Sequence, residues 1–213
     1  LGLQPYGMQP RADGAPMPPA AELSYGAILS RPVFWFIGVA AFATFYAILA
    51  ISYNLFLHTK DLGIDARDAA KYFVPLFIGG LVGKLLSGFV SDLFGRKRTW
   101  LIFLGLMLVG SLFLLTNSQQ WLFASVACFG LGWGGNYTLL QAITADAFGT
   151  RSLGKVMGAI TVLDAGGGAI GPWITGMLYD SFGSYIVAFW VIAALITLAI
   201  VMALLVPATE TKA

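Results

Sequence analysis

The sequence predicts an all-α integral membrane protein, because its composition and the length of its apolar runs fit no soluble fold. Of its 213 residues, 58% are hydrophobic and 10% are charged, and the mean hydropathy is +0.82. Soluble domains carry about 25% charged residues, so these few charges could not cover a globular surface. The net charge of +2 gives no reason to expect nucleic acid as a partner.

Six apolar runs are long enough to cross a bilayer, which takes roughly 20 helical residues. Pro32 opens the first run and suits the first turn of a helix, and Pro207 closes the sixth. Lys84 lies inside the second run and Asp164 inside the fifth. We therefore expect a six-helix bundle over residues 32–206, with spans at about 33–57, 72–90, 100–116, 121–142, 156–178 and 185–206.

Residues 1–31 and 207–213 lie outside the predicted bundle. The first segment is typical of an extended linker, with prolines at Pro5, Pro10, Pro16, Pro18 and Pro19. The second is a short tail. Eight of the 12 Lys and Arg residues fall on the side of both chain ends and three on the other side. Because Lys and Arg concentrate in cytoplasmic loops, we expect the linker and the tail in the cytoplasm.

An internal repeat relates the second span to the fifth. The first copy reads Gly83, Gly88, Asp92, Phe94, Gly95, and the second, 88 residues later, reads Gly171, Gly176, Asp180, Phe182, Gly183. An offset of 87 pairs Phe36 with Phe123, Val39 with Val126 and Phe42 with Phe129. The period is three spans, an odd number, so the second copy enters the membrane from the opposite side. The sequence thus predicts two inverted three-helix repeats, an arrangement common in secondary transporters.

The loop between the second and third spans carries a Gly-x-x-x-Asp-x-x-Gly frame followed by basic residues. In order, these residues are Gly88, Asp92, Gly95, Arg96, Lys97 and Arg98. Gly88 predicts a close approach of two helices, and Gly95 predicts a tight turn. A cytoplasmic loop alone would explain the basic triplet, but it would not explain the frame.

This frame resembles the cytoplasmic loop motif of the major facilitator superfamily, whose members have twelve spans in two six-span halves. The six spans resemble the C-terminal half, helices seven to twelve, and the proline-rich start resembles the central linker. Three stretches are similar to bacterial relatives of the monocarboxylate transporters and oxalate–formate antiporters, namely residues 2–7, 148–154 and 171–189.

The resemblance implies alternating-access transport of a small organic anion, with a monocarboxylate as the expected substrate. Dicarboxylate exchange, or transport of another small solute, is the alternative. Energy would come from a proton gradient or from anion exchange, and no cofactor or metal is expected. The resemblance also implies a bacterial inner membrane, a missing N-terminal six-helix half as partner, and lipid around the bundle.

Lys84 is the strongest candidate for substrate binding. A lysine in the middle of a membrane costs roughly 2.5–3.5 kcal/mol on insertion scales and normally faces a cavity or a partner. By the resemblance, Lys84 stands where the monocarboxylate transporters have an arginine that binds the substrate carboxylate. Lysine offers a point charge where arginine offers a bidentate fork. Snorkelling of Lys84 to the membrane interface is the alternative.

Asp164 is the candidate for proton coupling, because burial favours the protonated form of a carboxyl group. A structural ion pair with Lys84 is the alternative. The run from Gly166 to Gly168 follows Asp164 and predicts a weakened or broken helix. By the resemblance, the acid that animal relatives carry one turn before the substrate arginine corresponds to Gly80 here.

Polar side chains of the first and fourth spans complete the expected substrate site, since the resemblance places these spans at a central cavity. They are Tyr53, Asn54, Asn136, Tyr137 and Gln141. Each is alternatively a helix–helix contact. A second group is expected to form gating or structural contacts at the cytoplasmic face, including an ion-pair latch. Its members are Gly88, Asp92, Gly95, Arg96, Lys97, Asp146 and Arg151.

Membrane enzymes and channels fit the sequence less well. Intramembrane serine proteases also have about six spans, but no Gly-x-Ser motif leads to Ser87. No pair of aspartates and no zinc-ligand cluster occurs within the spans. The Asn-Pro-Ala tripeptide of water channels is absent. We therefore expect a transporter.

Overall fold

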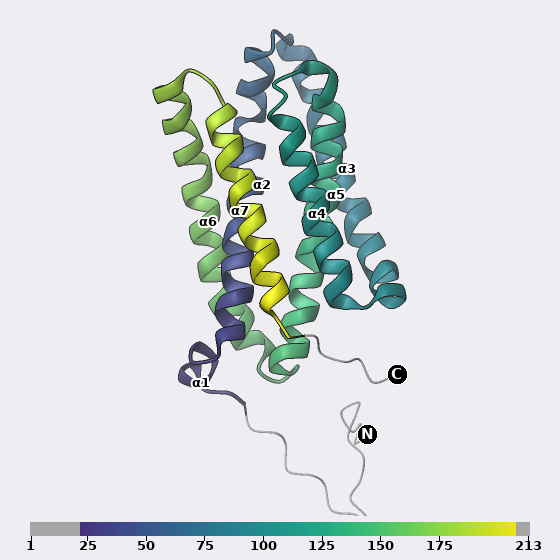
Figure 1. The fold of residues 1–213 in the computed structure, drawn as a ribbon, viewed down its shortest axis with the longest axis vertical. Helices are drawn as coiled ribbons and strands as arrows, with labels where there is room; N and C mark the ends of the chain where they lie inside the picture. Colours follow the sequence, from purple (N-terminus) through teal and green to yellow (C-terminus); the bar gives the residue numbers. More distant parts are fainter. Residues whose placement is uncertain (1–21, 208–213) are drawn as a thin grey trace, which may run out of the picture.

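The computed structural model describes residues 22–207, which form one short helix and six long ones (Figure 1). The short helix is α1, Tyr25–Leu29. The long helices are α2 (Pro32–Asp61), α3 (Ala66–Phe94), α4 (Arg96–Leu114), α5 (Gln119–Phe148), α6 (Leu153–Phe182) and α7 (Ile186–Leu205). Each predicted span coincides with one long helix, so the predicted all-α membrane fold is confirmed. Predictions for residues 1–21 and 208–213 lie outside the described residues.

Five of the long helices are long and apolar enough to cross a membrane: α2, α3, α4, α6 and α7. The fourth predicted span, on α5, is not among them although α5 has 30 residues. Glycines and polar side chains such as Asn136 and Gln141 lower its hydropathy. α5 packs along α3 and α4, and a helix packed against protein tolerates polar residues that a lipid-facing helix does not.

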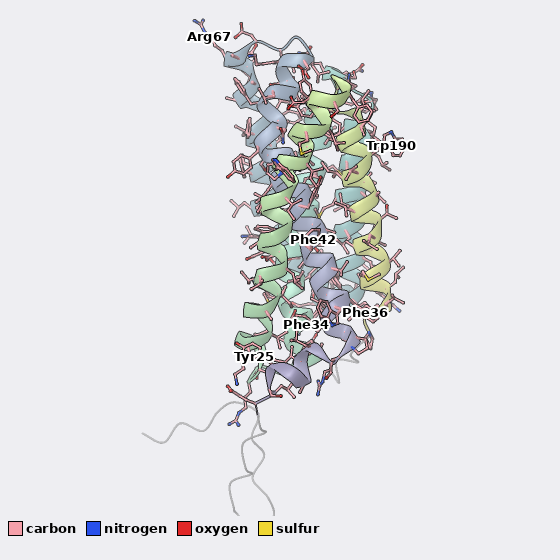
Figure 2. The ribbon with its side chains drawn as sticks, turned by 90° about the vertical axis from the view of Figure 1, so that its left-hand side faces the viewer. Tyr25, Phe34, Phe36, Phe42, Arg67 and Trp190 are labelled. Carbon is pink, nitrogen blue, oxygen red and sulfur yellow. The ribbon has the colours of Figure 1, made fainter. Side chains whose placement is uncertain are left out.

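The helix packing follows the inverted repeat. α3 packs on α5, and its repeat mate α6 packs on α2, the mate of α5. In the same way α4 packs on α5, α7 packs on α2, and α4 and α7 contact each other. Figure 2 shows Arg67 at one end of the bundle and Tyr25 near the other. We call the first the Arg67 end and the second, where α3 joins α4, the Arg96 end.

Glycines allow the repeated helix pairs to approach closely. A Cβ atom on Gly171 of α6 would lie 2.6 Å from the carbonyl oxygen of Tyr46 in α2, and one on Gly83 of α3 would lie even closer to the carbonyl oxygen of Leu131 in α5. The two glycines are 88 residues apart, as predicted, but the contacted residues are 85 apart. The predicted offset of 87 is therefore wrong for these packed surfaces, because matched Phe and Val residues recur at many positions whereas backbone contacts fix the register.

α6 runs unbroken from Leu153 to Phe182, so the predicted break at the triple glycine is wrong. A Cβ atom on Gly168 would lie 2.7 Å from the Phe45 side chain of α2, and one on Gly167 would meet the Phe42 backbone. These glycines serve the close contact between α2 and α6, and that contact supports the helix.

The two glycines of the loop frame behave differently. Gly95 alone connects α3 to α4 with φ of +81°, and its repeat mate Gly183 ends α6 with φ of +64°. L-residues rarely adopt such angles, and the predicted tight turn is confirmed. A Cβ atom on Gly88 would meet nothing within 4 Å, and the same holds for its mate Gly176. The predicted close helix approach at Gly88 is therefore absent in the described part of the chain.

The segment before α2 is helical over Tyr25–Leu29 and attached to the start of α6, within the range expected as a linker. The backbone N–H of Leu23 donates to the Ser152 hydroxyl at 3.0 Å. Glu22 forms an ion pair with Lys155. These contacts hold α1 against the Arg96 end of the bundle.

We expect the attachment through Glu22 to weaken in acid. The Lys155 ammonium donates to the Glu22 carboxylate and holds its pKa below the usual 4.5. The pKa of Glu22 is lower in the folded state than in the unfolded state. The ion pair therefore stabilises the folded state fully at pH values above the unfolded pKa, and this stabilisation is lost as the pH falls through the folded pKa. An NMR titration of the Glu22 carboxyl should give a pKa below 4.5, and Lys155→Met should raise that pKa. An identical titration in both proteins would contradict this contact.

Candidate functional site

Lys84 and Tyr137 meet across the contact between α3 and α5. The Lys84 ammonium nitrogen lies 5.5 Å from the centre of the Tyr137 ring. Each residue lies 18 positions after the first residue of its helix, and both helices begin at the Arg67 end, which explains why they are level. A cation over an aromatic face is attracted by about 0.5–2 kcal/mol. The structure thus brings together two residues that the sequence proposed separately.

The Lys84 charge is not neutralised within the described part of the chain. Its side chain is exposed, and the three ion pairs among the described residues lie elsewhere, at Lys71–Asp68, Arg96–Asp146 and Lys155–Glu22. Lys84 lies ten residues before the end of α3, or ~15 Å at 1.5 Å per residue. That is near the middle of a 30 Å hydrocarbon core. Its ammonium group points to an aromatic ring rather than to the end of the helix.

Residues at helical spacing surround Lys84 on two helices. On α3, Gly80 lies one turn before Lys84, and on α5, Trp133, Tyr137 and Gln141 follow at intervals of four. Residues four apart lie on the same face of a helix. The Trp133 ring lies 3.0 Å from the position of a Cβ atom on Gly80, and Gln141 is exposed. We call these five residues the Lys84 face.

Trp133 is the member of the Lys84 face that the sequence analysis missed. Its indole N–H is buried and has no acceptor among the described residues. An unpaired buried donor is costly, and it is available to an oxygen that enters beside it. Its spacing of four residues from Tyr137 is the sequence signal that could have identified it.

Asn136, Asn54 and Tyr53 lie away from the Lys84 face. Asn136 accepts a hydrogen bond of 2.7 Å from the Trp100 indole, which joins α5 to α4 in the core. The Asn54 amide donates to the Ala50 carbonyl at 2.9 Å and lines a small hollow bounded by α2, α4 and α7. Asn136 is thus a contact between helices, whereas the hydrogen bond of Asn54 lies within α2. Tyr53 is 70% exposed and lies nearer the Arg67 end.

Asp164 lies at nearly the same depth as Lys84, eleven residues from the start of α6 at the Arg96 end. α3 and α6 make no contact in the described chain, and no ion pair joins the two residues. The alternative that Asp164 neutralises Lys84 is therefore wrong for this structure. α2, the main packing partner of α6, has no Lys, Arg or His between residues 33 and 57. Asp164 is a buried carboxyl group with no cation facing it from α2.

The basic loop motif joins three helices at the Arg96 end. The Arg96 guanidinium forms an ion pair with Asp146 near the end of α5. The Lys97 ammonium donates to the Leu204 carbonyl at 2.8 Å and to the Val206 carbonyl at the end of α7. A cation there satisfies carbonyl groups that a helix leaves without partners. The start of α4 is thereby fixed to the ends of α5 and α7.

The remaining members of the expected gating group lie at the same end. Asp92 is exposed in the last turn of α3. Arg151 is exposed in the connection between α5 and α6, where its charge acts on Glu22. The pair of Arg96 with Asp146 provides the expected latch between helices.

We expect the latch to contribute modestly to stability. The Arg96 and Asp146 side chains are 43% and 25% exposed, and exposed ion pairs contribute about 0.2–1 kcal/mol. Thermal unfolding of Arg96→Gln, Asp146→Asn and the double variant should show a coupling energy in that range. The exchanged pair, Arg96→Asp with Asp146→Arg, should recover part of the loss. Additive effects of the two single variants would contradict the latch.

The chain is similar to known membrane transporters. Residues 72–213 match the family model of the Major Facilitator Superfamily. The chain is 29% identical over 166 residues to Monocarboxylate transporter 12 of Xenopus laevis, and the aligned stretch covers 76% of this chain and 36% of that protein. It is 27% identical over 136 residues to the cis,cis-muconate transport protein of Acinetobacter baylyi, which covers 63% and 33%. The chain thus spans about a third of the length of these curated relatives.

Solved structures show the same helix arrangement. The E. coli fucose:proton symporter FucP superposes with a TM-score of 0.75 at 16% identity, over 87% of this chain and 46% of that one. The POT family transporter PepTSo superposes with a TM-score of 0.74 at 21% identity, over 84% and 39%. The present fold therefore corresponds to rather less than half of either structure.

Proposed function

The chain belongs to the major facilitator superfamily, a family of integral membrane transporters and not of enzymes, and from this premise we propose that it forms one half of a secondary transporter for a small organic anion. The other half is proposed to be a second, N-terminal six-helix bundle, so that this chain supplies helices seven to twelve. Support comes from the inverted three-helix repeats and from the superposition on 46% of FucP. We call the assembled protein the two-half transporter.

The unpaired Lys84 ammonium group carries the proposal of an anionic substrate. A carboxylate would accept hydrogen bonds from Lys84 at mid-membrane depth, between the two bundles. Gln141 and the Trp133 indole are the neighbouring donors, and the Tyr137 ring holds the lysine in place. A cation at this depth is expensive in a membrane unless it faces a partner or a substrate.

The names of relatives support a carboxylate substrate, and they leave two substrate classes, monocarboxylates and dicarboxylates. Monocarboxylate transporter 12 favours a monocarboxylate, as the sequence resemblance does. The cis,cis-muconate transport protein favours the alternative, a dicarboxylate. On the Lys84 face only one cationic side chain is present among the described residues, and one cation matches one carboxylate. We therefore place the monocarboxylate first.

Asp164 is proposed to couple a proton to transport. It is buried in α6, level with Lys84 and without a cationic partner on α2. In the two-half transporter, Asp164→Asn should abolish uptake driven by a pH gradient and leave carboxylate exchange at zero gradient. Equal loss of both activities would point to a structural role for Asp164.

We propose that the protein lies in a bacterial inner membrane with the Arg96 end on the cytoplasmic side. Among the described residues that end carries Arg31, Arg96, Lys97, Arg98, Arg151 and Lys155, against Lys60, Arg67 and Lys71 at the other. The latch of Arg96 with Asp146 would then open and close on the cytoplasmic side as the halves rock. Thiol labelling of single cysteines placed at Arg67 and Arg98 from each side of the membrane tests this orientation.

The decisive experiment is flux in proteoliposomes that contain the two-half transporter. Uptake of radiolabelled lactate should saturate, and unlabelled lactate inside the vesicles should accelerate it by exchange. The neutral amide of the same acid should not compete, because it offers Lys84 no charge. Uptake that rises linearly with concentration would indicate a channel, and competition by the amide would rule out a carboxylate site.

A further inference from the structure

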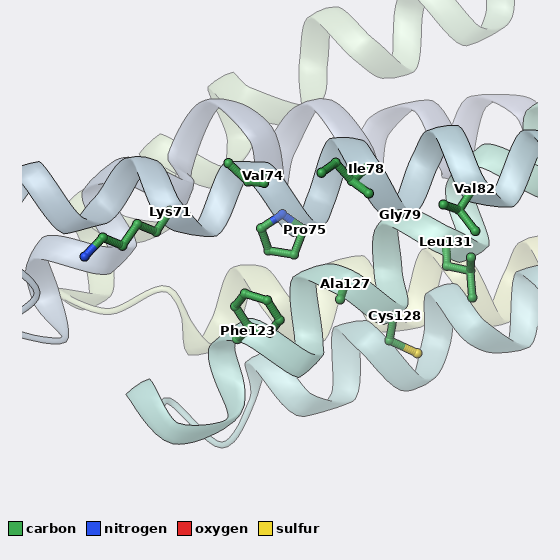
Figure 3. Close-up of a pocket in the computed structure, with 10 residues that line it drawn as sticks. All are labelled: Lys71, Val74, Pro75, Ile78, Gly79, Val82, Phe123, Ala127, Cys128 and Leu131. Atoms are coloured by element: carbon green, nitrogen blue, oxygen red, sulfur yellow. The ribbon is translucent and has the colours of Figure 1, made fainter.

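A large apolar groove lies between α3 and α5 (Figure 3), and no residue of the Lys84 face lines it. Its volume is about 570 Å³. Small residues form its floor, where the helices pack so closely that a Cβ atom on Gly79 would lie 2.8 Å from the Ala127 carbonyl oxygen. Lys71 is the one charged residue in the lining and lies at one end (Figure 3). The other lining residues are apolar or Cys128, and they are Val74, Pro75, Ile78, Val82, Phe123 and Leu131.

The groove has the depth of one leaflet of a bilayer. It begins at Lys71, five residues inside α3 from the Arg67 end, and continues to Val82. Eleven residues of helix rise ~16 Å, which is about half of a 30 Å hydrocarbon core. The groove therefore follows the membrane from the surface at the Arg67 end toward the midplane.

The inverted repeat contains a related hollow near the Arg96 end. Three positions of the first groove, Lys71, Val74 and Pro75, correspond at the offset of 88 to Ala159, Val162 and Leu163. These three line a hollow of about 390 Å³ between α2 and α6, and there Tyr25 and Leu29 of α1 form an additional wall. At this copy the chain thus adds two side chains of its own α1 to the lining. No described segment takes the place of α1 at the copy near the Arg67 end.

We propose that one acyl chain of a phospholipid from the leaflet at the Arg67 end fills this groove, with the lipid phosphodiester at Lys71. The apolar lining favours hydrocarbon over water. The Lys71 ammonium donates one N–H to Asp68, at 2.5 Å, and two of its three N–H groups remain for phosphate oxygens. Lysine near a membrane surface attracts anionic lipid, so phosphatidylglycerol binds in preference to phosphatidylcholine.

Native mass spectrometry tests this proposal without any measurement of transport. The protein is reconstituted in vesicles of equal phosphatidylglycerol and phosphatidylcholine, extracted in mild detergent and weighed. The wild type should retain one phospholipid, enriched in phosphatidylglycerol. Ala127→Phe and Ile78→Trp fill the groove from α5 and from α3, and each should reduce retention at least tenfold. Lys71→Met keeps the apolar stem and should reduce the preference for phosphatidylglycerol about fivefold.

Leu85→Trp is the matched control, since Leu85 is 72% exposed on α3 and does not line the groove. It should retain lipid as the wild type does. A wild-type protein without bound phospholipid would overturn the proposal. So would retention by Ala127→Phe or Ile78→Trp equal to that of Leu85→Trp. Because the two filling variants lie on different helices, misfolding of one leaves the other to decide.

Discussion

Replacing Lys84 by glutamine should lower the uptake of a carboxylate by the two-half transporter about ten- to a hundredfold at low substrate concentration. Hydrogen bonds to charged groups contribute about 1.5–3 kcal/mol, and 1.4 kcal/mol corresponds to a factor of ten. Glutamine keeps a polar side chain of similar length and removes only the charge. The structure provides no second cation on the Lys84 face to replace it, among the described residues. Initial rates of radiolabelled lactate uptake measure the effect.

Variants at Lys60, Lys84 and Tyr137 show whether this loss comes from the Lys84 charge. Lys60→Gln removes the charge of another exposed lysine, at the end of α2 and far from the Lys84 face, and should transport normally. Lys84→Arg keeps a cation and should retain most of the activity. Tyr137→Phe preserves the ring beneath the ammonium group, whereas Tyr137→Leu removes it and should weaken binding several-fold. Normal uptake by Lys84→Gln would show that α3 does not carry the anion site.

The helices and their repeat could be predicted because both leave local signals in the sequence. A run of about 20 apolar residues is readable without knowing its neighbours, and so is a glycine that permits a positive φ, as at Gly95. The contacts between helices could not be predicted in the same way. Gly88 and Gly83 look alike in the sequence, yet only Gly83 faces another backbone. Which glycine does so depends on the rotation of α3 against α5.

The same limit applies to the candidate site. The cost of a charge in the membrane singles out Lys84 and Asp164 from sequence alone. Which polar groups surround them depends on the face that each helix turns inward. Asn136 turns to Trp100 and not to Lys84, while its neighbour Tyr137 turns to Lys84. A rotation of about 100° between adjacent helical residues separates a packing contact from a member of the site.

One methyl group added at Gly83 should destabilise the chain strongly, and one added at Gly88 should not. The Cβ atom at Gly83 would lie far inside contact distance of the Leu131 carbonyl oxygen, a backbone atom that cannot rotate away. Overpacking of this kind costs about 1–3 kcal/mol or more. At Gly88 a Cβ atom meets nothing within 4 Å, and alanine favours the helix by about 1 kcal/mol. Circular dichroism in detergent should show a lower Tm for Gly83→Ala alone.

The same experiment in the second repeat tests whether the two three-helix repeats pack in the same way. Gly171→Ala adds a Cβ atom 2.6 Å from the Tyr46 carbonyl oxygen, whereas Gly176→Ala adds one in open space. Gly171→Ala should therefore behave as Gly83→Ala does, and Gly176→Ala as Gly88→Ala does. Because the contact at Gly171 is the longer of the two, its variant should lose less stability. Equal Tm values for Gly171→Ala and Gly176→Ala would contradict this prediction. The repeat would then be present in the sequence but not in the packing of α6 on α2.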